Sequence, residues 1–170
     1  MDSRPNASGA IWRSLLRLIL RIVIITVIGI VVFTKVFLIT QASGNGMFPS
    51  IRDGDLILAF RLERDHAKND VVVYSVGGVN RIGRIAASEG DIVTLDESGT
   101  LLVNGTVQSG EIMYPTYPSD GLTYPYRVPD NSVFILGDHR PDDEDSRKYG
   151  AIPMKDVCGK VITIIRRRGI

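Results

Sequence analysis

Apolar residues fill positions 11–39 almost without interruption, and no charged side chain occurs between Arg21 and Lys35. A helix that crosses a membrane needs about 20 predominantly apolar residues. The leucine and isoleucine residues before Arg21 extend the run, because long basic side chains near a helix end can reach the lipid head groups. The pattern therefore predicts a transmembrane helix over residues 11–40, preceded by a cytoplasmic tail of residues 1–10.

Two other interpretations of this run fit less well. A buried core helix would need more apolar surface around it than the neighbouring chain offers. A cleavable signal peptide, with Thr40 and Ala42 as its small residues, has an apolar core of only about 7–15 residues. Basic residues cluster before the run, so the positive-inside rule places the N-terminus in the cytoplasm. The rest of the chain is then outside the cell membrane, with residues 11–40 in contact with lipid.

Beyond residue 50 the apolar residues occur in short runs rich in β-branched side chains, separated by Gly, Asp and Asn. Such runs are typical of strands, and no segment keeps a helical period over about three turns. Asn104-Gly105 is a hairpin signal between two short strands. The pattern predicts an all-β extracytoplasmic domain over residues 41–170. Its expected strands are 56–60, 71–74, 82–86, 92–95, 101–103, 133–136 and 157–165.

Composition and charge exclude several classes of function. The net charge of +1 divides into +4 over residues 1–40 and −3 over the rest, with no basic patch interleaved with aromatic residues, so no nucleic-acid partner is expected. Cys158 is the only cysteine, which excludes an internal disulfide and a zinc framework. The acidic run 142–145 lacks the alternating oxygen ligands of a calcium loop. We expect neither a metal nor a cofactor.

One segment departs from the strand pattern. Residues 113–129 contain four tyrosines and four prolines. Proline removes a donor from the strand ladder, so the segment is predicted to be a loop or a sheet edge. It either packs on its own sheet or forms a tyrosine-rich surface that binds a protein.

Three stretches, 43–51, 83–93 and 136–150, resemble the conserved boxes of type I signal peptidases, which are membrane-anchored serine proteases. In that family the first box reads roughly G-x-S-M-x-P-T-L, the second K-R-h-h-G-x-P-G-D, with h apolar, and the third G-D-N-R-x-x-S-x-D-S-R. The order and spacing agree, and the resemblance covers essentially the whole chain. It implies a domain of antiparallel sheets coiled into a barrel-like body. The third box is the most specific, with matches at Gly137, Asp138, Arg140, Asp145, Ser146 and Arg147.

The residues that carry the family's chemistry are missing. The nucleophilic serine falls on Gly46, the lysine base on Gly83, and the serine that supports the lysine on Asp143. A serine hydroxyl is a poor nucleophile without a neighbouring base, and a lysine acts as that base only when its pKa is lowered. Glycine supplies neither group. The resemblance therefore predicts a signal-peptidase fold without an intact catalytic site. A replacement Ser-His site that uses His139 has no supporting spacing.

The resemblance also implies a peptide-binding cleft, because the family holds its substrate as an added strand between the first and second boxes. Its pocket would be lined by Met47, Ile51 and Ile82, with backbone amides of Gly44 and Asn45 nearby. Two glycines in place of serine and lysine are expected to enlarge this cleft. The implied structural framework is Asp138, Arg140, Asp145, Ser146 and Arg147. Within this framework we expect an ion pair between Asp145 and Arg147. Outside it, we expect Asp143 to pair with Arg84.

Signal-peptidase-like proteins that lack this catalytic dyad of serine and lysine occur in Gram-positive bacteria beside pilus components, and they assist pilin assembly. By this resemblance the chain is expected to be a pseudoprotease that binds exported proteins, with pilin subunits and a sortase as its partners. The alternative is an active signal peptidase whose serine has been mutated or whose base lies elsewhere. A third interpretation is a structural membrane protein with a relict site.

Overall fold

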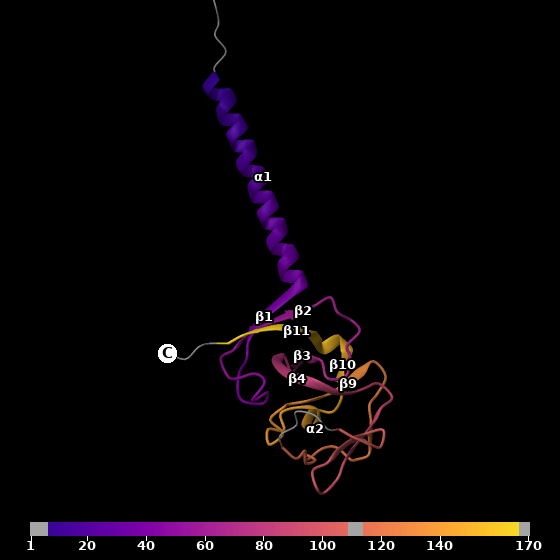
Figure 1. The fold of residues 1–170 in the computed structure, drawn as a ribbon. Coiled ribbons are helices and arrows are strands. Elements are labelled where there is room, and N and C mark those ends of the chain that lie inside the picture. The colour runs from indigo at the N-terminus through magenta and orange to yellow at the C-terminus, as the bar shows by residue number, and fades with distance from the viewer. Residues whose placement is uncertain (1–6, 109–113, 167–170) are drawn as a thin grey trace, which may run out of the picture. The chain divides into compact units, whose positions relative to one another are not determined.

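The computed structural model describes residues 7–108 and 114–166, and the chain divides into two compact units, residues 1–36 and 37–170 (Figure 1). The first unit holds α1 (Ala7–Val36), of which Ile11–Val36 is long and apolar enough to cross a membrane. The helix begins inside the predicted tail, because a helix once formed extends at little cost through residues such as Ala7 and Ala10. Residues 1–6 of that tail lie outside the described residues.

The predicted end of the helix at residue 40 is wrong. The helix ends at Val36, and the next residue begins β1 (Phe37–Gln41), which pairs antiparallel with β2 (Leu56–Phe60). A short apolar run can form either a helix or a strand, and periodicity does not separate the two. Here the aromatic and β-branched residues of β1 find a strand partner, which decides in favour of the sheet.

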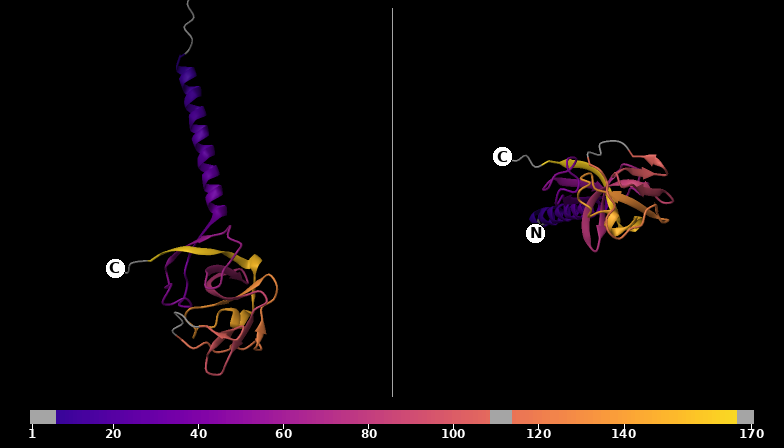
Figure 2. Two further views of the ribbon diagram at one scale, coloured as in Figure 1. Left: turned by 45° about the vertical axis from the view of Figure 1, so that its right-hand side comes forward. Right: turned by 90° about the horizontal axis from the view of Figure 1, so that it is seen from below.

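The second unit consists of two antiparallel sheets, and β11 (yellow) runs beside β2 in the larger one (Figures 1 and 2). The larger sheet has seven strands in the order β1-β2-β11-β3-β4-β9-β10, and the smaller has four in the order β7-β6-β5-β8. The remaining strands of the larger sheet are β11 (Val157–Ile165), β3 (Val71–Val76), β4 (Val79–Ser88), β9 (Ser132–Leu136) and β10 (Ile152–Pro153). Those of the smaller sheet are β5 (Ile92–Leu95), β6 (Leu101–Val103), β7 (Thr106–Val107) and β8 (Tyr126–Arg127).

The prediction of antiparallel β structure is confirmed, but the barrel-like body is not a closed barrel. Both sheets are open, with β1 and β10 at the edges of one and β7 and β8 at the edges of the other. The hairpin at Asn104-Gly105 joins β6 to β7, and both residues have positive φ, 52° and 75°. The sequence pattern missed β1, β7, β8, β10 and two short helices, α2 (Ser146–Tyr149) and η1 (Met154–Asp156). The pattern misses β1 because Phe37–Gln41 continues the apolar run of the predicted helix. The other missed elements have only two to four residues, too few to show a clear period.

The tyrosine-rich segment is divided between the predicted alternatives. Tyr124 and Tyr126 pack against a core cluster, and Tyr126 lies in the edge strand β8. Tyr117 remains exposed. Part of the segment is therefore packed on the protein's own sheets, more than half of its described residues are exposed, and Met113 lies outside the described residues.

An exposed apolar face runs over the three strands at one end of the larger sheet. Ile39, Leu56 and Ile165, on β1, β2 and β11, are 53%, 40% and 55% exposed. Exposed apolar patches of this kind mark contacts with protein or membrane. β1 directly continues the chain from α1, so the chain enters this sheet without a linker.

Strand β9 is buried at every residue, and its packing depends on a polar contact. The backbone N–H of Ile135 donates to Ser146 Oγ at 2.9 Å, and the Ser146 side chain is fully buried. This contact joins β9 to the first residue of α2. The serine matches the third box, and the structure explains its position by this strand N–H.

We expect Ser146→Ala to lower the free energy of unfolding of the full chain by about 1–3 kcal/mol, because the buried N–H of Ile135 would lose its acceptor. Denaturant unfolding followed by circular dichroism in detergent measures this. Ser75→Ala is the control. Ser75 is half-buried in β3, and its hydroxyl makes none of the hydrogen bonds found between described residues, so a change within about 0.5 kcal/mol is expected. Equal effects of the two substitutions would contradict this role of Ser146.

Candidate functional site

The three boxes meet at the carboxylate of Asp138. Ser50 of the first box donates to Asp138 Oδ2 at 2.6 Å. Arg84 of the second box donates from Nε and Nη2 to the two carboxylate oxygens at 2.8 and 2.7 Å. Burial acts to raise the pKa of Asp138, but the hydrogen bonds from Arg84 and Ser50 lower this pKa below its ordinary value. The charged carboxylate is therefore the form that holds the boxes together.

Two glycines bring the first box against the third. A Cβ on Gly137 would stand only 2.5 Å from the carbonyl oxygen of Gly46, so any other residue would push the two backbones apart. The same Gly46 oxygen accepts a hydrogen bond from the backbone N–H of His139 at 3.0 Å. The backbone of the third box thus fixes the position of the first-box loop around Gly46.

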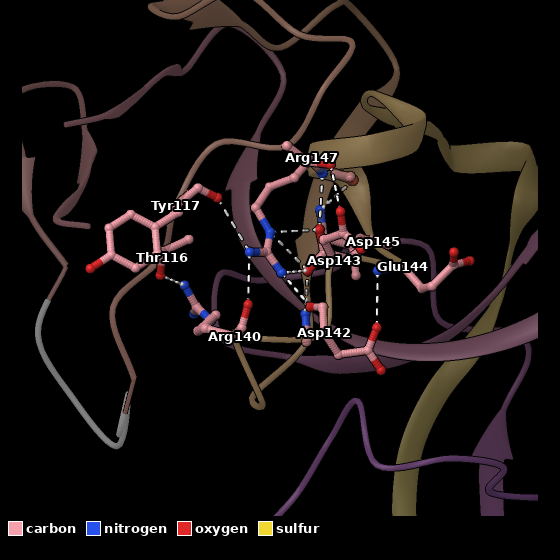
Figure 3. A network of polar contacts seen from close by, with 12 residues as sticks. Thr116, Tyr117, Arg140, Asp142, Asp143, Glu144, Asp145 and Arg147 are labelled. Atoms are coloured by element: carbon pink, nitrogen blue, oxygen red, sulfur yellow. Dashed lines mark hydrogen bonds and ion pairs between the residues drawn. The ribbon is translucent and has the colours of Figure 1, made fainter. Parts of the chain in front are cut away.

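A buried ion pair lies within the third box (Figure 3). Arg147 Nη2 lies 2.9 Å from Asp145 Oδ2, with both side chains less than 5% exposed. Asp145 also accepts the backbone N–H of Gly137 at 3.0 Å. Arg147 donates to the backbone carbonyls of Arg140, Tyr117 and Asp142. The pair therefore connects three backbone segments, and removing one partner of such a buried pair costs about 3–5 kcal/mol.

A second buried arginine ties the tyrosine-rich segment to the third box. Arg140 Nη1 donates to Thr116 Oγ1 at 2.6 Å, and both side chains are buried. Burial lowers the pKa of Arg140 to about 10, opposed by the charge of Asp145. The framework residues expected from the sequence, Asp138, Arg140, Asp145, Ser146 and Arg147, thus all contact neighbouring segments of the boxes.

The space beside Gly83 is filled, which contradicts the expectation that the two glycines enlarge the cleft. Gly83 lies in β4 and is buried. A Cβ there would be 2.4 Å from Ile135 Cγ2 and 3.2 Å from Tyr74 Cε1, and both of these side chains are buried. A larger side chain at position 83 requires Ile135 to move. At the base position the core has closed over the space that a lysine would need.

Asp143 is hydrogen-bonded to the tyrosine-rich segment. Its Oδ2 accepts a hydrogen bond from Ser119 Oγ at 2.6 Å, while Arg84 pairs with Asp138, so the structure gives the two side chains expected to pair other partners. The neighbouring Asp142 and Glu144 line the cleft instead. Sequence position alone could not show which of four consecutive acidic residues turns inward.

The cleft has a free volume of about 170 Å³ and lies over Gly46. Gly44, Met47, Ile51 and Ile82 line it, as expected from the resemblance. Asn45 is exposed and is not among its lining residues in the described part of the chain, and the Gly44 amide donates to Asp53 Oδ1 at 2.8 Å. The two backbone amides therefore do not both remain available to a ligand.

Several lining residues escaped the sequence analysis. Tyr74 and Arg81 reach the cleft from β3 and β4. Arg81 Nη2 lies 2.8 Å from Glu144 Oε2, and hydrogen bonds from Lys148 and Tyr149 lower the pKa of Glu144 to about 2. Tyr74 has its pKa raised by burial, so its phenol stays protonated. The acidic run 142–145 was the one sequence signal for these lining residues. Only the folded backbone shows which of its members line the cleft.

The chemical capacity of the cleft is limited at the two expected positions. Neither Gly46 nor Gly83 carries a side chain that can attack or take up a proton. Ser43 lines the cleft and carries a hydroxyl. Among the described residues no group of three or more histidine, cysteine or acidic side chains is placed to hold a metal ion.

The chain is similar in sequence to known processing peptidases and signal peptidases. The chain is 35% identical over 132 residues to a probable thylakoidal processing peptidase 2 from Arabidopsis thaliana, which covers 69% of this chain and 35% of that protein. It is 24% identical over 160 residues to signal peptidase I S from Bacillus subtilis, with 86% of each covered. A solved signal peptidase I from Enterococcus faecalis is 25% identical, with a TM-score of 0.49, over 58% of this chain and 97% of that one.

The chain spans only 35% and 38% of the length of the two thylakoidal processing peptidases that it matches. The family described as signal peptidase, peptidase S26, matches residues 15–165, and so includes most of α1 and all three boxes. This match covers well over half of the chain. The protein therefore belongs to the signal peptidase family, peptidase S26.

Proposed function

We propose that this chain is a membrane-anchored pseudoprotease that binds extended segments of exported proteins without cleaving them. The observation that carries the proposal is the pair of glycines at positions 46 and 83. Glycine offers neither the hydroxyl nor the amine that the family's dyad requires. The side chains of Ile135 and Tyr74 that fill the space beside Gly83 support the same proposal.

The surviving cleft supports the binding half of the function. Its lining includes the apolar side chains of Met47, Ile51 and Ile82, and it lies between the first box, the start of β4 and the third box. An extended peptide added at such a place gains backbone hydrogen bonds, and side-chain pockets give it specificity. We infer that the bound partners are exported proteins, and by resemblance to dyad-less proteins of Gram-positive bacteria, pilin subunits handled together with a sortase. The chain would then act as an assembly factor or chaperone.

A second candidate function is signal-peptide cleavage. Relatives in five bacterial species and in chloroplasts are named peptidases, and Ser43 places one hydroxyl in the cleft. Under this alternative the native chain cleaves signal peptides, and Ser43→Ala abolishes the cleavage.

Cleavage of a fluorogenic signal-peptide substrate by the full chain in detergent separates the two candidates. Loss of the nucleophile of a serine hydrolase lowers turnover by about a millionfold, so we expect no cleavage by the native chain. We expect the variant Gly46→Ser, Gly83→Lys, Ile135→Leu to cleave. Leucine has no methyl group on Cβ, so Ile135→Leu removes the 2.4 Å contact at nearly constant volume.

Three controls accompany this assay. The same variant with Gly46 retained lacks the nucleophile and should be inactive. The variant with Ile135 retained should be less active, because the lysine introduced at position 83 would then meet Cγ2 of Ile135. Cleavage by the native chain would contradict the pseudoprotease proposal. If the triple variant does not cleave the substrate, the cleft no longer holds a signal peptide in the position needed for cleavage.

Partners of the cleft can be identified by a photocrosslinking amino acid at Val79 in living cells. Val79 lines the cleft and is 57% exposed. The matched control is Val107, which is 55% exposed on β7 of the smaller sheet. We expect exported proteins, pilin subunits among them, to crosslink from position 79 and not from position 107, as identified by mass spectrometry. The same partners from both positions would contradict binding in the cleft.

The proposed topology has the N-terminus in the cytoplasm and the β domain outside the cell membrane, because Arg13, Arg17 and Arg21 lie in the N-terminal part of the span. In a Cys158→Ala background, Ser98→Cys should react with a membrane-impermeant maleimide in intact cells. Ser3→Cys should react only after permeabilisation. The reverse pattern of labelling would overturn this orientation.

A further inference from the structure

The cleft has an apolar floor and one acidic wall. Three carboxylates of the third box line it, those of Asp142, Glu144 and Asp145. The latter two have cationic partners, because Glu144 pairs with Arg81 and Lys148, and Asp145 pairs with Arg147. Their charges are therefore already compensated within the protein.

The carboxylate of Asp142 differs from both. Its Oδ1 accepts the backbone N–H of Glu144 at 3.2 Å, and its backbone carbonyl accepts from Arg147 Nη2. Figure 3 shows the carboxylate turned away from the Arg147 guanidinium. Among the residues that the structure describes, no lysine, arginine or histidine nitrogen makes an ion pair with Asp142. Its charge is uncompensated at the wall of a cleft.

Gly46 leaves this carboxylate accessible. A Cβ at position 46 would stand 3.3 Å from Asp142 Oδ2, and the backbone there is not in the left-handed region that favours glycine. The conformation of the loop therefore does not require a glycine at this position. What the missing side chain changes is the approach to Oδ2, because a side chain at position 46 would cover that oxygen.

A peptide that lies over this wall removes water from the charged carboxylate of Asp142. Covering a carboxylate with an uncharged peptide removes water without supplying a positive charge, which is costly. A cationic side chain of the peptide instead forms a charge-assisted hydrogen bond, the stronger class of such bonds. Oδ1 already accepts the Glu144 N–H, and Oδ2 is the oxygen nearest position 46, so a cation that approaches past Gly46 meets Oδ2 first. A single acceptor suits the compact ammonium of lysine better than the two-pronged guanidinium of arginine.

We propose that Asp142, reached past Gly46, is a subsite that selects peptides carrying a lysine at the position facing the former nucleophile. This inference rests on the proposed function, because it assumes that the cleft binds peptides. Under this proposal, glycine at position 46 does more than remove the nucleophile. It also gives a lysine side chain of the peptide access to Asp142.

Fluorescence polarisation with the full chain in detergent tests the subsite. The probes are short, blocked, labelled host peptides of alanine, valine and threonine, in which one guest residue moves through every position. The guests are lysine, norleucine, which lacks only the ammonium group, and arginine. At one guest position we expect lysine to bind about tenfold more tightly than norleucine, as a charge-assisted hydrogen bond predicts, with arginine between them.

Asp142→Asn is the main variant, because asparagine keeps an oxygen for the Glu144 N–H and removes the charge. It should abolish the preference for lysine over norleucine. Asp143→Asn removes the same charge one residue away, where the carboxylate faces Ser119, and should keep the preference. Gly46→Ala should reduce the preference, because its Cβ stands in front of Oδ2.

The outcomes separate the two proposals. Peptides that bind with no lysine preference at any position, or a preference that survives Asp142→Asn, would overturn the lysine subsite and leave the proposed function in place. An equal loss in Asp143→Asn would assign the preference to general charge attraction and also overturn the subsite. If no peptide binds to the native chain, both proposals fail.

Discussion

The arrangement of the site depends on the buried ion pair between Asp145 and Arg147. Through Asp145 it orders the Gly137 amide, and through Arg147 it orders the carbonyls of Arg140, Tyr117 and Asp142. Two buried charges are costly unless they are paired and their remaining hydrogen bonds are satisfied. Here the backbone supplies those bonds, so the pair imposes one conformation on a loop that has little regular structure of its own.

The segments held by this ion pair in turn position the rest of the cleft. Gly137, fixed by Asp145, lets the Gly46 loop approach closely, and Asp138, the next residue, joins Ser50 and Arg84. None of these contacts involves the side chains at positions 46 and 83. This independence explains how a member of the signal peptidase family can change both positions while the boxes around them stay assembled.

The two glycine positions have different physical consequences. At position 83 the core closes, because Ile135 and Tyr74 occupy the space next to the backbone. At position 46 the space stays open toward solvent and toward the Asp142 carboxylate. A buried position adjusts by packing, whereas a position at a cleft changes what a ligand can reach. The proposed pseudoprotease function and the proposed lysine subsite follow from these two different responses.

Local patterns in the sequence, a long apolar run and β-branched runs between turn residues, were enough to predict the apolar helix, the β class of the domain and most of its strands. The resemblance to the family was enough to predict Met47, Ile51 and Ile82 as residues that line the cleft. Only the folded chain shows that Phe37–Gln41 is a strand, since its partner β2 lies elsewhere in the chain. The same is true of Asp142, which faces the cleft where Asp143 does not, and of Ile135 and Tyr74, which fill the space beside Gly83. These features depend on contacts between residues far apart in sequence, and a local pattern carries no record of such contacts.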